Sequence, residues 1–319
     1  MTTNQQVLHN LSFQQLQCCR FKILFSSQLD RMVDVTIVAA LCAKTGAIGF
    51  QNKLPWRDRL NIDMAFFRFV TTVPWSLSCA ADGHHARAPK EAAPSTAPLE
   101  PYCATNRWRG IFDTDACFPH IECTLAFENL TCPPNPNNAI IMGRKTADSI
   151  PVALPLPGRV NVVLSKSLND SENCHVPDSS ISKDHNGILY CKDIQSVCRD
   201  LSRITALSNI LVIGGSEIYS QFLKLGLVDH LLLTFVSLQT PSSFKGADVF
   251  FPSIPANYRF VANISYQAAN ALLEWIGTPQ DTKRLLRHQI DTGLILKSGS
   301  IKESSGHLLN ILWFQKMRC

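Results

Sequence analysis

Short apolar runs alternate with longer amphipathic stretches over much of this chain. Six runs are rich in apolar and β-branched residues and too short to form helices of their own: residues 33–42, 138–143, 159–165, 187–191, 209–213 and 230–236. Such runs are typical of strands buried on both faces, as in parallel sheets. Helical patterns follow at residues 144–151, 194–207 and 216–226, and further strands are predicted at 258–266 and 308–314. Strands that alternate with helices predict an α/β fold with a central, mostly parallel mixed sheet flanked by helices.

Residues 54–70, LPWRDRLNIDMAFFRFV, combine a proline-tryptophan turn with an apolar helical pattern that carries one acid. Asp63 and Phe67 lie four residues apart, so on a helix their side chains project from the same face. A flat ligand with a polar edge would suit this pair. The alternative is structural, with Asp63 favouring the positive end of the helix dipole and Phe67 forming part of the core. The stretch alone leaves both readings open.

Three segments lack sustained periodicity. Residues 73–137 hold nine of the eighteen prolines and are predicted to be an irregular surface insertion. Residues 277–305 are polar and basic and are predicted to be a loop or a second insertion. Residues 1–31 are rich in Gln, Ser and Leu, and we expect a disordered extension, with a mitochondrial presequence as the alternative. The remainder predicts a single domain over residues 32–319, in a cytoplasmic protein or, if the extension acts as a presequence, a mitochondrial one.

Composition narrows the classes of partner. The net charge of +5 is mild and scattered, with no basic run of the kind that binds nucleic acid, and no apolar run reaches the ~18 residues of a membrane span. None of the twelve cysteines forms a C-x-x-C pair, so reduced thiols in an intracellular protein are expected. Five cysteines lie between Cys79 and Cys132 near His84, His85 and His120, but their irregular spacing predicts no metal site.

Glycine and basic residues mark the turns after three predicted strands. In an open parallel sheet, ligands bind beyond the carboxyl ends of the strands. Gly214 and Gly215 let the next helix aim its free N–H groups at a phosphate, so a nucleotide pyrophosphate is the expected guest; the alternative is that the pair only eases tight packing. The basic turns at 143–146 and 165–166 fit an additional phosphate, as on NADP, although solvated surface charge explains each turn equally well.

Taken in order, seven motifs closely resemble dihydrofolate reductase, particularly the fungal enzymes. They are IVAALCAKTGAIGFQNKLPW, DMAFF, NAIIMGRKTADSIP, LPGRVNVVLSKS, ILVIGGSEIY, LLLTFV and ADVFFP. The resemblance covers residues 33–72 and, with looser ends, 138–269. It implies that family's single-domain fold and hydride transfer from NADPH to C6 of dihydrofolate with protonation at N5, which gives tetrahydrofolate. It also implies a monomer whose partners are dihydrofolate and antifolates, without nucleic acid or membrane.

On the substrate side, the resemblance implies a single pocket acid. Asp63 matches the carboxylate that hydrogen-bonds the 2-amino and N3 groups of the pterin and favours protonation at N5, and such charge-assisted bonds suit a donor-rich ring edge buried between apolar walls. Thr234 matches the hydroxyl of the same network. Trp56 is expected to pack beneath the loop and to help hold an ordered water near Asp63. The ring-binding and tail-binding residues implied are Phe67, Ile150, Leu156 and Arg159, the last as a bidentate partner of the glutamate α-carboxylate.

On the cofactor side, the implied residues fall into three groups. Those beside the nicotinamide are Ala40, Ile48 and Gly49. Those of the adenine-ribose phosphate site are Gly143, Arg144, Lys145, Thr146, Ser165 and Lys166. Those of the pyrophosphate turn and the tyrosine near the nicotinamide are Ile213, Gly214, Gly215, Ser216, Glu217, Ile218 and Tyr219.

The chain departs from the family pattern in two places. Between Trp56 and the pocket acid it has two additional residues, Asp58 and Arg59, which we expect to bulge before the helix and leave Asp63 inside. The usual tryptophan-glutamate pair after the GRKT-like turn is replaced by Ala147 and Asp148, and loss of a core aromatic costs roughly 3–5 kcal/mol unless the space is filled. Two alternatives therefore stay open: a riboflavin-pathway pyrimidine reductase of the same fold, and a catalytically weakened relative that binds nucleotide or partners.

Overall fold

A computed structural model describes residues 33–79, 123–127, 137–166, 174–176, 179–204, 207–275 and 299–317. The chain divides into two units, Met1–Val33 and Asp34–Cys319, and all described helices and strands belong to the second. The predicted extension at 1–31 lies outside the described residues, as does most of the predicted insertion at 73–137.

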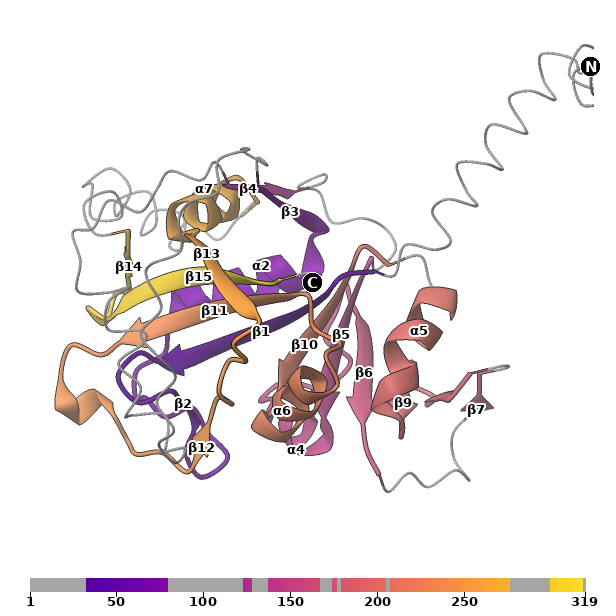
Figure 1. Cartoon of the computed structure of the whole chain (residues 1–319). Coiled ribbons are helices and arrows are strands. Elements are labelled where there is room, and N and C mark those ends of the chain that lie inside the picture. Colours follow the sequence, from indigo (N-terminus) through magenta and orange to yellow (C-terminus); the bar gives the residue numbers. More distant parts are fainter. Residues whose placement is uncertain are drawn as a thin grey trace, which may run out of the picture. The chain divides into compact units, whose positions relative to one another are not determined.

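An 11-stranded mixed sheet forms the centre of this unit (Figure 1). In spatial order its strands are β13 (Tyr258–Asn263), β15 (Leu308–Lys316), β11 (His230–Ser237), β1 (Val35–Cys42), β10 (Asn209–Gly214), β5 (Asn138–Gly143), β6 (Val160–Leu164), β9 (Leu189–Cys191), β8 (Ile181–Lys183) and β7 (Cys174–His175), with β14 (Ile301–Lys302) paired to β15. The six strands from β11 to β9 run parallel, and the flanking strands are antiparallel. The predicted α/β fold with a mostly parallel sheet is confirmed.

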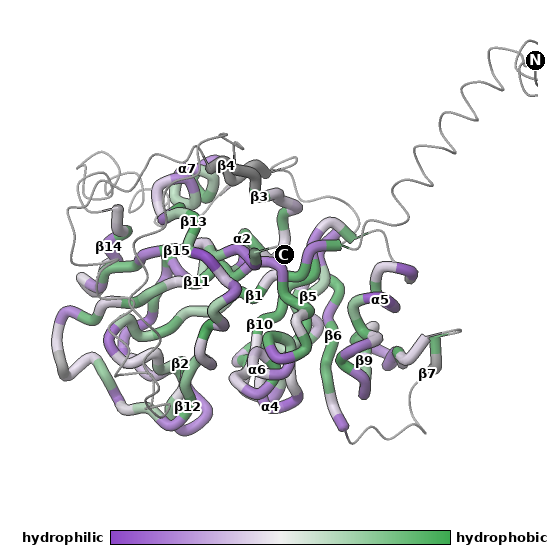
Figure 2. Tube along the Cα trace, in the orientation of Figure 1, coloured by the Kyte–Doolittle hydropathy of each residue, from purple (hydrophilic) through white to green (hydrophobic). Residues whose placement is uncertain are grey.

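The central strands are continuous apolar runs because both of their faces are covered. β1, β5, β6 and β10 are mainly hydrophobic along their length (Figure 2), as expected for parallel strands. The helices are α2 (Asn61–Thr72), α4 (Arg144–Ser149), α5 (Ile194–Ile204), α6 (Ser216–Lys224) and α7 (Ser265–Trp275), and a short 3-10 helix spans Pro241–Ser243. A two-stranded ladder joins β2 (Ala47–Gly49) to β12 (Val249–Phe250).

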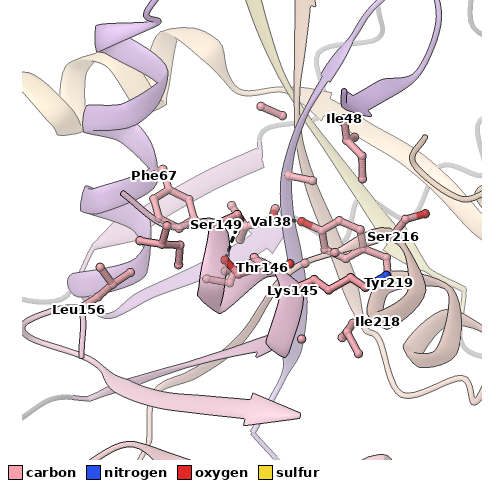
Figure 3. Close-up of a pocket in the computed structure, with 18 of the residues that line it drawn as sticks. Val38, Ile48, Phe67, Lys145, Thr146, Ser149, Leu156, Ser216, Ile218 and Tyr219 are labelled. Atoms are coloured by element: carbon pink, nitrogen blue, oxygen red, sulfur yellow. Dashed lines mark hydrogen bonds between the residues drawn. The ribbon is translucent and has the colours of Figure 1, made fainter. Parts of the chain in front are cut away.

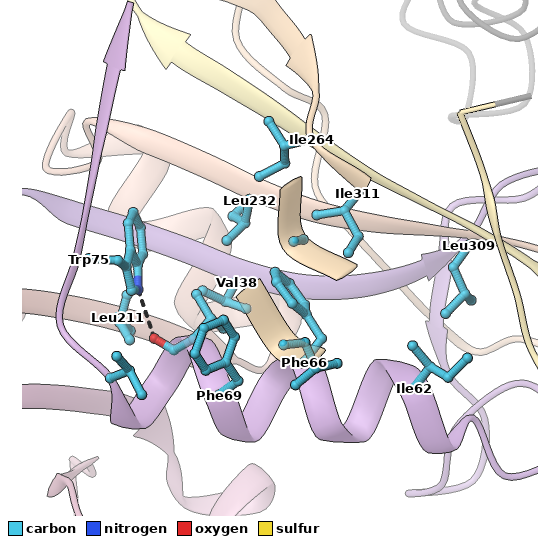
Figure 4. Packing of buried hydrophobic residues seen from close by; sticks show 14 of the residues in the cluster. Val38, Ile62, Phe66, Phe69, Trp75, Leu211, Leu232, Ile264, Leu309 and Ile311 are labelled. Atoms are coloured by element: carbon cyan, nitrogen blue, oxygen red, sulfur yellow. Dashed lines mark hydrogen bonds between the residues drawn. The ribbon is translucent and has the colours of Figure 1, made fainter. Parts of the chain in front are cut away.

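Helix α2 carries the residues that the sequence marks for chemistry, and its inner face is part of the core. Ile62, Phe66 and Phe69 are almost fully buried in one cluster with Val38 of β1 and Leu232 of β11 (Figure 4). Burial of one large apolar side chain stabilises the fold by about 1.5–3 kcal/mol. The helix is therefore firmly held against the sheet, and its remaining face is available to line a site.

Of the predicted irregular insertion at 73–137, the structure describes residues 73–79, 123–127 and 137, and these include a strand pair. β3 (Trp75–Cys79) pairs antiparallel with β4 (Cys123–Phe127). Trp75 is buried, and its indole Nε1 donates to the carbonyl of Val70 at 2.8 Å. The side chain of Asn209 bonds both to the Trp75 amide (3.2 Å) and to its carbonyl (2.9 Å). These bonds tie the start of the segment to the core, which local proline content did not reveal.

Two predictions near the C-terminus also need correction. The strand predicted at 258–266 ends at Asn263, because the Asn263 side chain accepts hydrogen bonds from the amide (3.1 Å) and hydroxyl (2.6 Å) of Ser265 and so starts α7. The loop predicted at 277–305 is ordered in its last residues, where β14 pairs with β15 and Glu303 is 1% exposed. Residues 276–298 lie outside the described part of the chain.

Candidate active site

A cavity of about 2250 Å³ opens along the carboxyl ends of the parallel strands β1, β5, β6 and β10. This is the position expected for a ligand site in such a sheet. With the exception of Trp56, every substrate-site and cofactor-site residue predicted from the sequence lines this cavity. Figure 3 shows Phe67 and Leu156 on one side, Ile218 and Tyr219 on the other, and Thr146 of α4 between them. The cavity thus has two ends of different chemistry.

Of the described residues that line the cavity, Asp63, Asp193 and Glu217 are acidic, and Asp63 is the one on α2. It lies in the first turn of α2, its side chain is half-buried on the cavity wall, and the hydroxyl of Thr234 on β11 hydrogen-bonds to it. Burial raises the pKa of Asp63 to about 7; the bond from Thr234 opposes this rise, and the charge of Glu303 adds to it. A carboxyl group that titrates near neutral pH can both hold and release a proton.

The two additional residues before α2 are placed as expected. Asp58 and Arg59 lie in the bend that precedes the helix, which begins at Asn61. Because the extra length is absorbed before the helix, Asp63 keeps its place on the cavity wall.

Apolar side chains enclose the acidic end. Phe67 of α2, Ile150 at the end of α4 and Leu156 in the loop before β6 all line the cavity. The loop is fixed by Asn161, whose side chain accepts from the Leu156 amide at 2.8 Å and donates to the Leu156 carbonyl at 2.9 Å. These apolar walls would suit flat rings.

Arg159 lies beyond these walls and is 8% exposed. Its Nη1 donates to the hydroxyl of Thr71 at 2.5 Å and its Nε to the carbonyl of Pro157 at 3.1 Å. The guanidinium group is therefore held in a fixed orientation between α2 and the loop. A fixed planar cation is the preferred partner of a carboxylate.

At the other end of the cavity, Gly143, Gly214 and Gly215 let the start of α4 and the start of α6 lie close together. A Cβ atom at Gly143 would stand 2.9 Å from Cγ1 of Ile218, a distance that only glycine avoids. Gly214 has a φ of +128°, the peptide bond to Gly215 is cis, and α6 begins at the next residue. The hydroxyl of Tyr219 donates to the carbonyl of Val38 at 3.1 Å, and burial raises the pKa of this tyrosine. The first turn of α6 thus faces the cavity with its backbone N–H groups.

Cations surround the same end. Arg144 and Lys145 begin α4, and Lys166 follows β6. Lys192, which follows β9, also lines the cavity and was not predicted. The rule that ligands lie beyond strand ends would have found it, since it directly follows the run at 187–191.

Trp56 is the one predicted site residue that does not line the cavity. It is 2% exposed, and its backbone forms an isolated bridge with Phe244. Its indole Nε1 is buried and has no hydrogen-bond partner among the described residues. An indole N–H normally has a partner when buried, so the predicted role of Trp56 in holding a water stays open as a prediction.

Sequence reasoning missed two further contributors. Trp275, at the end of α7, lines the cavity beside α2, with its ring centroid 5.1 Å from that of Phe69 and 5.9 Å from Cζ of Arg68. No sequence pattern indicated Trp275, because the helix that carries it, α7, was not predicted. Glu303, which follows β14, accepts hydrogen bonds from the first turn of α2 and was placed in a loop.

The part of the chain that the structure describes supports neither a metal site nor a membrane-spanning helix. No group of three or more His, Cys, Asp or Glu side chains there could hold a metal ion. His84, His85 and His120 lie outside it. Within the same ranges, no helix combines the length and apolar character that crossing a membrane requires.

The fold and the cavity define an α/β domain with the half-buried Asp63 carboxyl group at one end of the cavity and glycine turns with cations at the other. Comparison with known proteins shows which family this part of the chain is similar to. Residues 126–272 match the family model for dihydrofolate reductase. The match confirms, over these residues, the resemblance inferred from the motifs.

Curated relatives agree with this match. The dihydrofolate reductase of Candida albicans is 37% identical over 116 residues, which are 36% of this chain and 53% of that protein. That of Saccharomyces cerevisiae is 36% identical over 123 residues, 38% of this chain and 54% of the relative. That of Drosophila melanogaster is 32% identical over 133 residues, 41% of this chain and 64% of the relative. The chain spans about half the length of the two fungal relatives. The family match begins after α2, so the assignment of Asp63 depends on geometry.

Proposed function

We propose that this chain reduces dihydrofolate to tetrahydrofolate with NADPH as the hydride donor. The observation that carries the proposal is the half-buried Asp63 carboxyl group, which lines the cavity with apolar side chains, is bonded to Thr234 and has its pKa raised to about 7. A donor-rich heterocycle edge needs such an acceptor, and its ring nitrogen needs a proton as hydride arrives. The names of the relatives, dihydrofolate reductases in each case, support the same activity.

The residues of the cavity fit NADPH in shape and in charge. At Gly215 a Cβ atom would approach Oγ1 of Thr146 to 3.2 Å, so the glycine turn leaves room where a pyrophosphate would meet the start of α6. Arg144, Lys166 and Lys192 would hold the additional phosphate of the adenine ribose. When bound, NADPH supplies the hydride.

The protein's own side chains would position the substrate and manage one proton. Phe67 and Leu156 would enclose the rings, and Arg159 would bind the glutamate α-carboxylate through paired N–H donors. Asp63 would accept hydrogen bonds from the pterin edge. Because burial raises the pKa of Asp63 to about 7, this carboxyl group can hold a proton close to neutral pH, which would raise the chance that N5 is protonated.

The test is an absorbance assay of NADPH oxidation by the folded full-length chain, with and without methotrexate. Methotrexate-sensitive oxidation that requires dihydrofolate would support the proposal. Absence of such oxidation in well-folded protein would overturn it. Activity on a riboflavin-pathway pyrimidine without activity on dihydrofolate would favour the alternative reductase of the same fold. Binding of NADPH without turnover of either substrate would favour a catalytically weakened relative.

A further inference from the structure

The turn between β14 and β15 reaches the first turn of α2. Glu303 lies in this turn, where its amide donates to the His307 carbonyl at 2.8 Å and its carbonyl accepts from the Gly306 amide at 2.9 Å. Its Oε1 atom accepts from the backbone amides of Ile62 (2.7 Å) and Asp63 (3.1 Å), 241 and 240 residues away in the sequence. The residue at the helix's own N-cap, Leu60, offers no side-chain bond. Glu303 therefore caps α2 from a distant strand pair.

Capping by itself does not account for a glutamate at this position. One acceptor oxygen is enough to bind the free N–H groups of a helix end, and neutral side chains commonly do so. The second oxygen, Oε2, is buried and has no hydrogen-bond partner among the described residues. Glu303 as a whole is 1% exposed. A buried carboxylate with one unpartnered oxygen carries a desolvation cost that a neutral cap would avoid.

The charge of Glu303 acts on the pocket acid. Asp63 is bonded through its own amide to Glu303, and the two carboxyl groups repel each other when both are ionised. Burial raises the pKa of Glu303 as well, while the amides of Asp63, Ile62 and Asn61 oppose that rise. Among the described residues, the hydroxyl of Thr234 is the other group that acts on Asp63. The guanidinium groups of Arg59, Arg68 and Arg159 line the same cavity.

We propose that Glu303 is a positioning residue for Asp63. Its Oε1 fixes the helical turn from which Asp63 enters the cavity, and its negative charge favours the protonated form of the Asp63 carboxyl. The consequence for catalysis rests on the proposed function, because only there does the proton on Asp63 serve a substrate. The coupling between the two carboxyl groups does not depend on turnover.

The decisive variant is Glu303→Gln, which keeps the acceptor oxygen and removes the charge. Titration of Asp63 is followed by NMR in protein labelled with ¹³C at the aspartate side-chain carboxyl, and the spectrum of Asp63→Asn assigns the signal. In Glu303→Gln the midpoint for Asp63 should fall by roughly one pH unit. The matched control is Glu274→Gln, an exposed residue of α7 outside the cavity, which should leave the midpoint unchanged.

The wild-type protein supplies a second measurement that needs no variant at position 303. With glutamate side-chain carboxyl groups labelled as well, Asp63 and Glu303 should titrate as a coupled pair, each signal responding to both protonation steps. A single-step curve for Asp63, or an unchanged midpoint in folded Glu303→Gln, would overturn the proposal and leave Glu303 as a cap only.

Activity distinguishes this inference from the proposed function. If the chain turns over dihydrofolate, the upper pH limit of kcat/KM should move to lower pH in Glu303→Gln by the same amount as the NMR midpoint. A midpoint that moves while the wild type has no such turnover would refute the proposed function and retain the role of Glu303. A moved midpoint with an unmoved pH limit in an active enzyme would contradict the catalytic part of the inference.

Discussion

The carboxylate of Asp58 lies 2.8 Å from Nε2 of His307, and this contact joins the bend before α2 to the β14–β15 turn. The other ring nitrogen, Nδ1, accepts from the amide of Gln239 at 3.2 Å, so the proton of the neutral ring is on Nε2 and is donated to Asp58. Asp58 is one of the two residues that exceed the family spacing. The additional length is therefore anchored to the strand pair that also carries Glu303, and it does not displace Asp63.

This contact predicts a pH-dependent effect on stability. The hydrogen bond from His307 lowers the pKa of Asp58, so the ionised carboxylate stabilises the folded state above the unfolded pKa of 3.8, and this contribution is lost as pH falls through the folded value. Asp58→Asn should lower the melting temperature at pH 7 and have little effect in strong acid. Thermal unfolding followed by circular dichroism across this range checks it. Equal melting temperatures at pH 7 would show that the contact contributes nothing measurable.

Asp63→Asn should reduce activity in a pH-dependent manner. Without a titratable carboxyl, protonation at N5 must come from solvent, so kcat/KM should fall about 100-fold at neutral pH and less in acid. A pH profile of NADPH oxidation for the variant and the wild type provides the measurement. A loss of the same size at every pH would argue against a proton-linked role.

The same substitution should stabilise the protein at alkaline pH. The folded-state pKa of Asp63 is raised from 3.8 to about 7, so above that pH the fold holds a buried charge that the unfolded chain solvates. Asn is neutral at every pH and removes this cost. Asp63→Asn should therefore melt several degrees higher than the wild type at pH 8, with a smaller difference at pH 5. A variant that melts lower at pH 8 would contradict the burial of this charge.

The positive charges of Arg144 and Lys166 should make the protein bind NADPH more tightly than NADH. Removing one phosphate partner by Arg144→Ala or Lys166→Ala should raise KM for NADPH by about 3–10-fold and leave KM for NADH unchanged, because the affected contact is to a group that NADH lacks. Arg144 is exposed and also approaches Asp148 at 3.9 Å, which places its effect at the lower end of that range. Lys224→Ala, on the last turn of α6 and outside the cavity, is the control. Equal losses with both cofactors would remove the phosphate role.

Arg159 should be required for affinity rather than for chemistry. Arg159→Leu should raise KM for dihydrofolate by about 100-fold with a smaller change in kcat, since the lost paired bonds lie away from the reacting atoms. Arg159→Lys should recover only part of this, because an ammonium group cannot make the planar double contact. Steady-state kinetics of both variants, with Arg203→Leu on the surface of α5 as the control, test the assignment. An unchanged KM would place the substrate's carboxylate elsewhere.

Local sequence pattern was sufficient for the parts of the site that depend on a single element. The four-residue spacing of Asp63 and Phe67 predicted one shared helix face, which the resemblance assigned to the substrate, and the glycines after the run at 209–213 marked the start of α6. Both follow from helix geometry and from the backbone freedom of glycine. Strand ends in a parallel sheet then converge on one edge, so residues far apart in the chain could be assigned to one site.

Contacts between distant elements could not be predicted in this way. Glu303 meets Asp63 only because β15 pairs with β11, which brings the β14–β15 turn to the start of α2. Nothing in the local composition of residues 299–305 indicates that partner. α7 was missed for a related reason: a single residue separates it from β13, so the apolar pattern continues across the boundary, and the cap from Asn263 that starts the helix is a side-chain effect.

The most direct test of the central claim is to identify the product formed with NADPH deuterated at both C4 positions of the nicotinamide ring. Purified full-length protein is incubated with dihydrofolate and this cofactor, and the folate is examined by mass spectrometry and proton NMR. Hydride transfer predicts tetrahydrofolate with a single deuterium at C6 and no deuterium at N5 after exchange into ordinary water. Recovery of unreacted dihydrofolate from folded protein, or of tetrahydrofolate without deuterium at C6, would contradict the assignment.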